Sequence, residues 1–412
     1  MKKIIGLAAL TALMASTVTV SCDNVDEYVP PTVPSGYTTD WNAVADSSTT
    51  AFIQNFWNAE KGFFNAKSDG YHGETNNYWP QAHAMDVIIA AYLRTGDKKY
   101  SDMFDKWYEG IKVQCWSGSK DKFWVPLYDD NAWISISMMK IYDITKDTKY
   151  LEAAKYLHED MMANGWDNEN IGGLSWGAPG TSYYGDSRAI CTNGPACVLA
   201  FKLYNATGDE HYAENGMKIY KFLREYVLDP GTGRVLNGIN RKTLLSEGED
   251  SREYSYTHGT VMASALEAYR YTGDAAYLKD AYRIGYYVTN VACADQATGA
   301  LFFENKSWRW DDDGGDPTLF RAVLFPYLAD VIEAPEVPEM WREKFFKTLN
   351  ITAVQAWTNG ILDRSDYSFI MYNSNMTKGV NVSQGEIGYL NPNTTGASCI
   401  EARARLYKSL GK

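Results

Sequence analysis

The stretch Thr207-Gly208-Asp209-Glu210-His211-Tyr212 recurs in related form at three other places in the chain. Its residues suit a corner between two helices, because glycine ends one helix in a left-handed conformation and aspartate then caps the next. In one copy Lys146 replaces the glycine, so that corner is expected to be strained or to close differently. The other copies are Thr95-Gly96-Asp97 with Tyr100, Thr145-Lys146-Asp147 with Tyr150, and Thr272-Gly273-Asp274 with Tyr277.

Helical apolar patterns flank each corner, and the corners stand about 50 to 65 residues apart, which is too long for a tetratricopeptide-type array. The repeat therefore predicts helical hairpins, each with a long loop. Across the chain the patterns predict twelve helices, paired as six hairpins. Their expected starts lie near Asp40, Trp79, Asp97, Asp130, Asp147, Asn193, Asp209, Tyr256, Asp274, Pro317, Pro338 and Thr395.

The long loops all precede the first helix of a hairpin, whereas the corners after that helix are tight. All long loops then emerge on one face, which favours closure of the hairpins into an all-α (α/α)6 barrel rather than an open solenoid. A site is expected at the N-terminal ends of the inner helices, where helix dipoles favour negative groups. The expected loops are 63–77, 115–128, 165–188, 235–254, 303–317 and 359–393.

Composition narrows the classes of function. The 412 residues are 45% hydrophobic and 14% aromatic, which excludes a disordered chain. The formal net charge of −12 repels phosphate backbones, so nucleic acid is not expected as a partner. Tyr and Trp exceed what a core needs, and their polar tips suit wet surfaces such as sugar sites.

The first residues have the composition of an export signal. Two lysines precede an apolar run from Ile4 to about Val20, which predicts a signal peptide over residues 1–21. Val20-Ser21-Cys22 resembles a bacterial lipobox, so Cys22 is the predicted lipidation site, and an unlipidated secreted protein is the alternative. We then expect residues 22–39 to form a lipidated tether and residues 40–412 to form the (α/α)6 domain of an outer-membrane lipoprotein, which is expected to be a monomer.

The most specific pattern is Phe123-Trp124-Val125-Pro126-Leu127-Tyr128-Asp129-Asp130-Asn131-Ala132-Trp133. Glycoside cleavage needs two carboxyl groups, one ionised and one protonated, and adjacent like charges push their titrations apart. Because consecutive Cα atoms are ~3.8 Å apart, the pair predicts the short carboxyl separation of a retaining mechanism. The alternative is that Asp130 only caps the helix while Asp129 is solvated.

With the Thr-Gly-Asp corners, this pattern resembles glycoside hydrolase family 76. The resemblance also covers Leu319-Phe320-Arg321 through Tyr327-Leu328-Ala329, and extends over most of the chain from about Asp40. It implies an (α/α)6 barrel, endo-α-1,6-mannanase activity, and α-mannan or manno-oligosaccharide as the bound partner. It further implies that Asp129 is the nucleophile and Asp130 the general acid/base.

Two sites depart from the family pattern. This chain has Tyr256-Thr257-His258-Gly259 where Tyr-Asn-Gln-Gly is frequent, and Pro326 where arginine is common, which bears on subsite preference rather than on the reaction class. Aromatic and polar residues near the loops are candidates for sugar binding, with packing or helix capping as the alternative for each. The candidates are Trp79, Trp124, Tyr128, Trp133, Asn193, Tyr256, His258 and Trp310.

The remaining titratable residues do not match a metal or cofactor pattern. The five histidines have no HExxH spacing, no phosphate-binding loop is present, and neither metal nor cofactor is expected. The acidic loop 311–316 fails the EF-hand template, which leaves a solvated turn, recognition of a sugar hydroxyl by one carboxylate, or an adventitious ion. Five cysteines remain besides Cys22, and only Cys191 and Cys197 stand close enough for a disulfide worth testing.

Two other functions fit much of the same sequence. One is another (α/α)6 enzyme, which acts on a different polysaccharide such as a uronide, or as a sugar epimerase, and for which a separated acid pair or histidines would be typical. The other is a non-catalytic, glycan-binding surface lipoprotein, for which only the Asp129 and Asp130 pair is superfluous.

Overall fold

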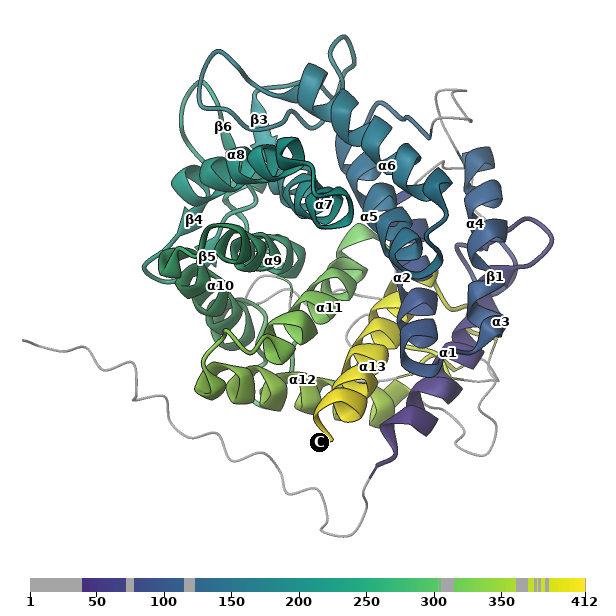
Figure 1. Cartoon of the computed structure of the whole chain (residues 1–412). Coiled ribbons are helices and arrows are strands. Elements are labelled where there is room, and N and C mark those ends of the chain that lie inside the picture. Colours follow the sequence, from purple (N-terminus) through teal and green to yellow (C-terminus); the bar gives the residue numbers. More distant parts are fainter. Residues whose placement is uncertain are drawn as a thin grey trace, which may run out of the picture.

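The computed structural model describes residues 39–71, 78–114, 123–302, 304, 315–360, 370–373, 376, 379–381 and 385–411. Helices dominate this part of the chain, and they form an inner and an outer ring (Figure 1). The inner helices are α2 (Tyr78–Thr95), α5 (Tyr128–Thr145), α7 (Ile190–Thr207), α9 (Ser255–Thr272), α11 (Phe320–Glu333) and α13 (Leu390–Leu410). The outer helices are α1 (Trp41–Phe56), α3 (Lys98–Ser101), α4 (Phe104–Ile111), α6 (Thr148–Asp160), α8 (Glu210–Tyr226), α10 (Ala275–Tyr287) and α12 (Glu339–Gly360).

The inner ring is closed. Each inner helix packs against the next in chain order, and α13 packs back against α2. Outer helices cover their hairpin partners: α6 lies on α5, α8 on α7, α10 on α9 and α12 on α11, while α1 covers α13. The predicted (α/α)6 barrel is therefore confirmed.

Burial follows the two rings. The inner helix α9 is buried without a break from Ser255 to Leu266, whereas the outer helix α8 buries one stripe and exposes the other. Small residues allow the inner helices to approach closely. A Cβ at Gly194 would stand 2.3 Å from Thr260 Oγ1 across the α7–α9 contact, and one at Gly259 would stand 3.1 Å from Leu324 Cα on α11.

The four repeated corners have the predicted geometry. Gly96, Gly208 and Gly273 have φ of 71°, 69° and 72°, and each following aspartate accepts a backbone N–H two residues later. Lys146 takes the same left-handed conformation, with φ 57° and ψ 18°. That corner thus closes like the others, at the cost of a strained lysine.

Some predicted helix starts are wrong by several residues. Helix α13 begins at Leu390, five residues before Thr395, because Pro392 falls in the first turn, where its missing N–H costs nothing. Helix α7 begins at Ile190 rather than Asn193, and α11 begins at Phe320 after a short 3-10 turn at 316–318. The helix expected after Asp97 is interrupted between α3 and α4.

Strands are short in the described part of the chain. β3 (Ser187–Ala189) pairs antiparallel with β6 (Gly238–Asn240), and this pair ties the loop before α7 to the loop before α9. Two further hairpins lie elsewhere: β1 (Trp57–Asn58) with β2 (Phe63–Phe64), and β4 (Leu228–Asp229) with β5 (Arg234–Val235). Each helix in the described ranges is too short or too polar to span a membrane.

Candidate active site

Asp129 and Asp130 occupy the first turn of α5, which begins at Tyr128. The loop before them is clamped: the Asn131 side chain accepts from Val125 N–H at 3.0 Å and donates to Val125 O at 2.9 Å. The Tyr128 N–H donates to Trp176 O at 2.9 Å. These bonds fix where both carboxylates leave the backbone.

The Asp129 carboxylate is surrounded by donors. Its Oδ1 accepts the Asp130 N–H at 3.0 Å, its Oδ2 accepts the Trp176 indole N–H at 2.9 Å, and the Cys191 thiol also donates to it. Burial raises the pKa of Asp129 to about 6, while these donors oppose that rise. Asp129 is therefore able to ionise at mildly acidic to neutral pH.

The Asp130 carboxyl group has a less favourable environment for charge. It is 5% exposed and accepts the Trp79 N–H at 2.8 Å, at the start of α2. Burial, and then the neighbouring charge of Asp129, raise the pKa of Asp130 well above its ordinary value, with a smaller contribution from Asp316. Of the two groups, Asp130 is the one that keeps its proton.

A central cavity of about 590 Å³ opens beside this pair, at the N-terminal ends of the inner helices. Among the described residues that line it there is no lysine or arginine. Its aromatic walls are Trp79, Trp133, Trp176, Tyr256 and Phe320, and its carboxyl groups are Asp129, Asp130, Glu247, Glu249, Asp250 and Asp316. Aromatic faces with carboxyl groups of unlike protonation are suited to binding and protonating a neutral glycan.

Three of the predicted sugar-binding residues line this cavity: Trp79, Trp133 and Tyr256. Trp79 also donates its indole N–H to Asp316 Oδ1 at 3.1 Å, and Tyr256 donates its hydroxyl to Asn237 Oδ1. Both rings are thus oriented by hydrogen bonds to other residues of the cavity wall.

Four predicted residues do not line the cavity. Trp124 donates its indole N–H to Asp160 at 2.7 Å, and Tyr128 is fully buried with its ring against Gly165. The Asn193 amide bonds the backbone of Leu174 and Ala189. These residues hold loops and helix starts in place.

His258 is the fourth of these residues and is also fully buried. Its Nδ1–H donates to Tyr254 O at 2.7 Å, so its Nε2 accepts the Val235 N–H at 3.2 Å. Burial lowers the pKa of His258 to about 4, and the ring is neutral. It joins the loop at 235 to α9 instead of facing the cavity.

Other predicted residues lie outside the described residues: Trp310, Cys22 and the rest of 1–38, and 311–314 of the acidic loop. Asp316, the last residue of that loop, does line the cavity and holds Trp79. Cys191 and Cys197 are both free thiols, so the disulfide considered from their spacing is not formed.

Sequence reasoning did not select Asn237 or the acidic run from Glu247 to Asp250. The β3–β6 pairing brings this segment to the cavity, and Asp250 accepts the Ser187 hydroxyl at 2.8 Å. The signal was present as a cluster of carboxylates in a loop before an inner helix. Its position beside Asp129 depended on a pairing that periodicity does not reveal.

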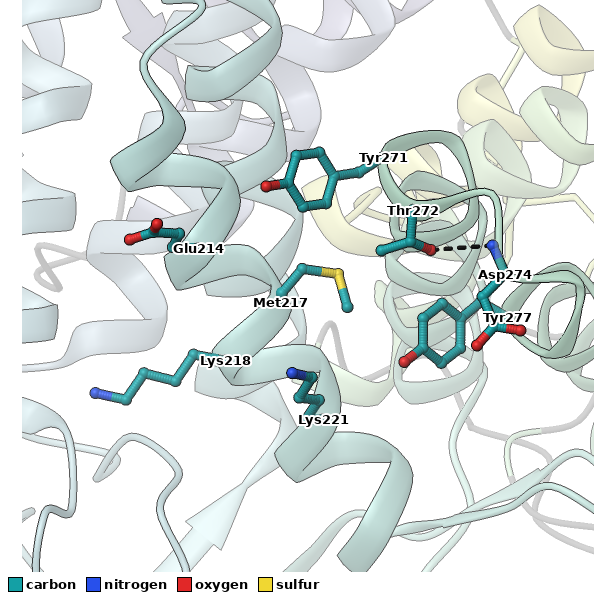
Figure 2. Close-up of a pocket in the computed structure, with 8 residues that line it drawn as sticks. All are labelled: Glu214, Met217, Lys218, Lys221, Tyr271, Thr272, Asp274 and Tyr277. Carbon is teal, nitrogen blue, oxygen red and sulfur yellow. Dashed lines mark hydrogen bonds between the residues drawn. The ribbon is translucent and has the colours of Figure 1, made fainter.

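A second cavity, of about 750 Å³, lies between the outer helices α8 and α10 (Figure 2). It carries charges of both signs, from Glu214 and Asp274 and from Lys218 and Lys221. Part of its wall is a repeated corner, where the Asp274 N–H bonds Thr272 Oγ1 at 3.2 Å. The described residues that line this cavity come from α8, α10 and the corner between α9 and α10, and they include no pair of adjacent carboxyl groups with different protonation states.

A double ring of helices, with an unequal carboxyl pair beside an aromatic cavity at the inner N-termini, defines a glycoside hydrolase of the (α/α)6 class. The chain belongs to glycosyl hydrolase family 76, whose model matches residues 40–390. A search of curated proteins found no match.

Solved structures of similar fold cover nearly the whole chain. An inactive double variant of an α-1,6-mannanase from Salegentibacter sp. HEL1_6, with two consecutive aspartates changed to asparagine and α-1,6-mannotriose bound, is 27% identical. The match covers 89% of this chain and 100% of that one, with a TM-score of 0.76. A family 76 mannosidase of Bacteroides thetaiotaomicron VPI-5482 is 19% identical over 91% and 100% of the two chains, with a TM-score of 0.70, and supports the fold alone.

Proposed function

We propose that the enzyme hydrolyses α-1,6-mannosidic bonds in a mannan backbone, by a retaining mechanism and at internal positions. The observation that carries the chemistry is the unequal environment of Asp129 and Asp130. Three donors favour the ionised form of Asp129, whereas burial and the Asp129 charge favour the protonated form of Asp130. One nucleophile and one acid are thus available at the same pH.

In the first step the Asp129 carboxylate attacks the anomeric carbon, and Asp130 gives its proton to the departing glycosidic oxygen. Charge leaves Asp129 as the covalent bond forms, and it appears on Asp130 as the proton leaves. The Trp79 N–H at Asp130 Oδ1 then stabilises the new carboxylate. In the second step Asp130 takes a proton from water, which attacks the same carbon and releases Asp129.

The substrate class is supported by the relatives and by the cavity. The Salegentibacter mannanase is described with α-1,6-mannotriose bound, and its inactive variant lacks two consecutive aspartates. In this chain the consecutive pair Asp129 and Asp130 lies beside five aromatic rings and four further carboxyl groups, without a cation among the described lining residues. Such walls favour a neutral polysaccharide. Lipidation at Cys22 and attachment to the outer membrane remain part of this proposal on the sequence alone.

The deciding experiment uses debranched α-1,6-mannan with wild type, Asp129→Asn, Asp130→Asn and the matched control Asp143→Asn. Asp143 lies on the same helix at its corner end and is half-exposed, beside Lys146. Both pair variants are expected to lose activity by about 10⁴-fold, and the control to keep it. Proton NMR of the first product should show the anomer of the substrate, and early products should be oligosaccharides of mixed length.

Chemical rescue separates the two roles. Asp130→Ala should still release the leaving group of an activated aryl α-mannoside, because such a group needs no proton, and azide should then accelerate turnover. Inverted product would contradict the retaining mechanism. Tight mannan binding by the wild type without release of reducing ends over a day would instead identify a glycan-binding protein.

A further inference from the structure

His83 lies on α2 between two tryptophans of the central cavity, although it does not line the cavity itself. Its ring centroid is 4.7 Å from that of Trp79, with an interplanar angle of 83°, and 5.0 Å from that of Trp133, at 65°. The two indoles are 5.6 Å apart at 49°. The imidazole thus packs against both indoles, behind two adjacent rings of the cavity wall.

The orientation of the His83 imidazole is fixed by Asp86, which lies one turn further along α2. His83 Nδ1 stands 3.4 Å from Asp86 Oδ2. Asp86 is itself held from α5, because it accepts the Ser137 hydroxyl at 2.9 Å and the Lys140 ammonium at 2.8 Å. The orientation of the imidazole is therefore set by two neighbouring inner helices.

Burial and the neighbouring groups determine the protonation states of Asp86 and His83. Burial would raise the pKa of Asp86, but the Lys140 charge and the His83 hydrogen bond hold that pKa well below its usual range. Burial lowers the pKa of His83 below its ordinary value, against the opposing effect of Asp86. A neutral imidazole therefore donates to a permanent carboxylate, which keeps one tautomer.

Trp79 connects this array to the reacting groups. Its backbone N–H bonds Asp130 and its indole N–H bonds Asp316, while its ring rests on His83. If the Trp79 indole shifted by a fraction of an ångström, both the surface that contacts the sugar and the position of Asp316 would change. Small misplacements of this kind are costly because the reacting atoms must be aligned.

We propose that His83 is a positioning residue. It sets the angle between the Trp79 and Trp133 rings, and thereby the position in which the mannosyl unit binds beside Asp130. This role rests on the proposed hydrolysis, because it is that reaction which requires the mannosyl unit to bind beside Asp130. His83 acts through the two rings and the bond to Asp86, and makes no contact with the substrate.

The test compares two variants. His83→Ala removes the ring that packs against the two indoles, whereas His83→Phe keeps a ring but not the bond to Asp86. The matched control is His158→Phe. His158 is buried, as His83 is, but it lies on the outer helix α6, 5.6 Å from the ring of Tyr212. We expect His83→Ala to lower kcat about 10-fold with a smaller change in KM, His83→Phe to recover part of the loss, and His158→Phe to keep wild-type kinetics.

A second readout needs no substrate. Near-ultraviolet circular dichroism of the free protein reports the coupling between adjacent indoles, so it should change in His83→Ala, change less in His83→Phe, and stay unchanged in His158→Phe. If both His83 variants keep the wild-type spectrum and kcat and lose only thermal stability, the proposal is wrong. Failure of the wild type to cleave mannan would overturn the proposed function, while the spectra would still decide the role of His83.

Discussion

The two ends of the barrel use the same residue type in opposite ways. At the corner end, Asp97, Asp147, Asp209 and Asp274 each accept a backbone N–H at the start of an outer helix. At the loop end, Asp129 and Asp130 are packed together among aromatic rings. One set of carboxylates caps helices, and the other is placed where charge is unfavourable.

The pKa of one corner aspartate and the pKa values of the buried pair move in opposite directions. The backbone hydrogen bond from Lys99 holds the pKa of Asp97 below its usual value, whereas burial raises the pKa of Asp129 to about 6 and that of Asp130 further. The capping hydrogen bonds stabilise the corner end, whereas the buried pair costs stability at the loop end and leaves one carboxyl group protonated. This difference predicts that substitutions at the two ends will affect activity and stability in opposite directions.

The largest effect is expected from Asp130→Asn compared with Asp209→Ala. Asp130 has a folded-state pKa above its unfolded value, so its contribution to stability is present at low pH and is lost as pH rises above the unfolded value near 4. Asparagine cannot ionise. Asp130→Asn should therefore lose the proposed mannanase activity by about 10⁴-fold and have a higher Tm at pH 7, with the gain in Tm vanishing below pH 4.

Asp209→Ala should do the reverse. It removes the acceptor of the His211 N–H and should cost about 1 kcal/mol of unfolding free energy, with wild-type kcat/KM. Calorimetry across pH with parallel rate measurements checks both variants. A lower Tm for Asp130→Asn at pH 7 would show that the pair is not a strained feature of the fold.

The corner end was predictable from sequence because its signals are local. Glycine or lysine in the left-handed position and aspartate at the cap stand within three residues of each other, so the hairpins and the closed barrel followed from Thr207-Gly208-Asp209 and its copies. Asp129 and Asp130 were found for the same reason, as adjacent residues before a helical pattern.

The loop end was only partly predictable because its contacts join distant residues. The Trp79 indole bonds Asp316, 237 positions away, and the Trp176 indole bonds Asp129, 47 positions away. Such pairs exist only once the ring has closed and the loops have met. Residues that looked equally good in sequence, such as Trp124 and Trp133, are therefore separated by the fold alone.

An intermediate effect is expected from Trp176→Phe, which removes one donor from Asp129. A carboxylate with fewer donors is harder to ionise, so the pKa of Asp129 should rise above about 6. The acidic limb of the kcat/KM profile should move to higher pH by about half a unit to one unit. Trp124→Phe is the control, since its indole bonds Asp160. An acidic limb that stays in place in Trp176→Phe would separate this limb from the titration of Asp129.

The smallest effect sharpens the corner end itself. Lys146 holds the left-handed position that glycine holds in the other three corners, and such a conformation costs a residue with a Cβ about 1 kcal/mol. Its compensations are weak, because its ammonium is 3.7 Å from the half-exposed Asp143 and 5.0 Å from the Tyr142 ring centroid. Lys146→Gly should therefore raise the unfolding free energy by about 0.5–1 kcal/mol without changing kcat/KM, as urea unfolding would show. The reciprocal change Gly208→Lys should lower it by a similar amount, because both corners close with the same backbone geometry. If Lys146→Gly were instead destabilising, the lysine contacts would outweigh the strain, and the four corners would not be equivalent.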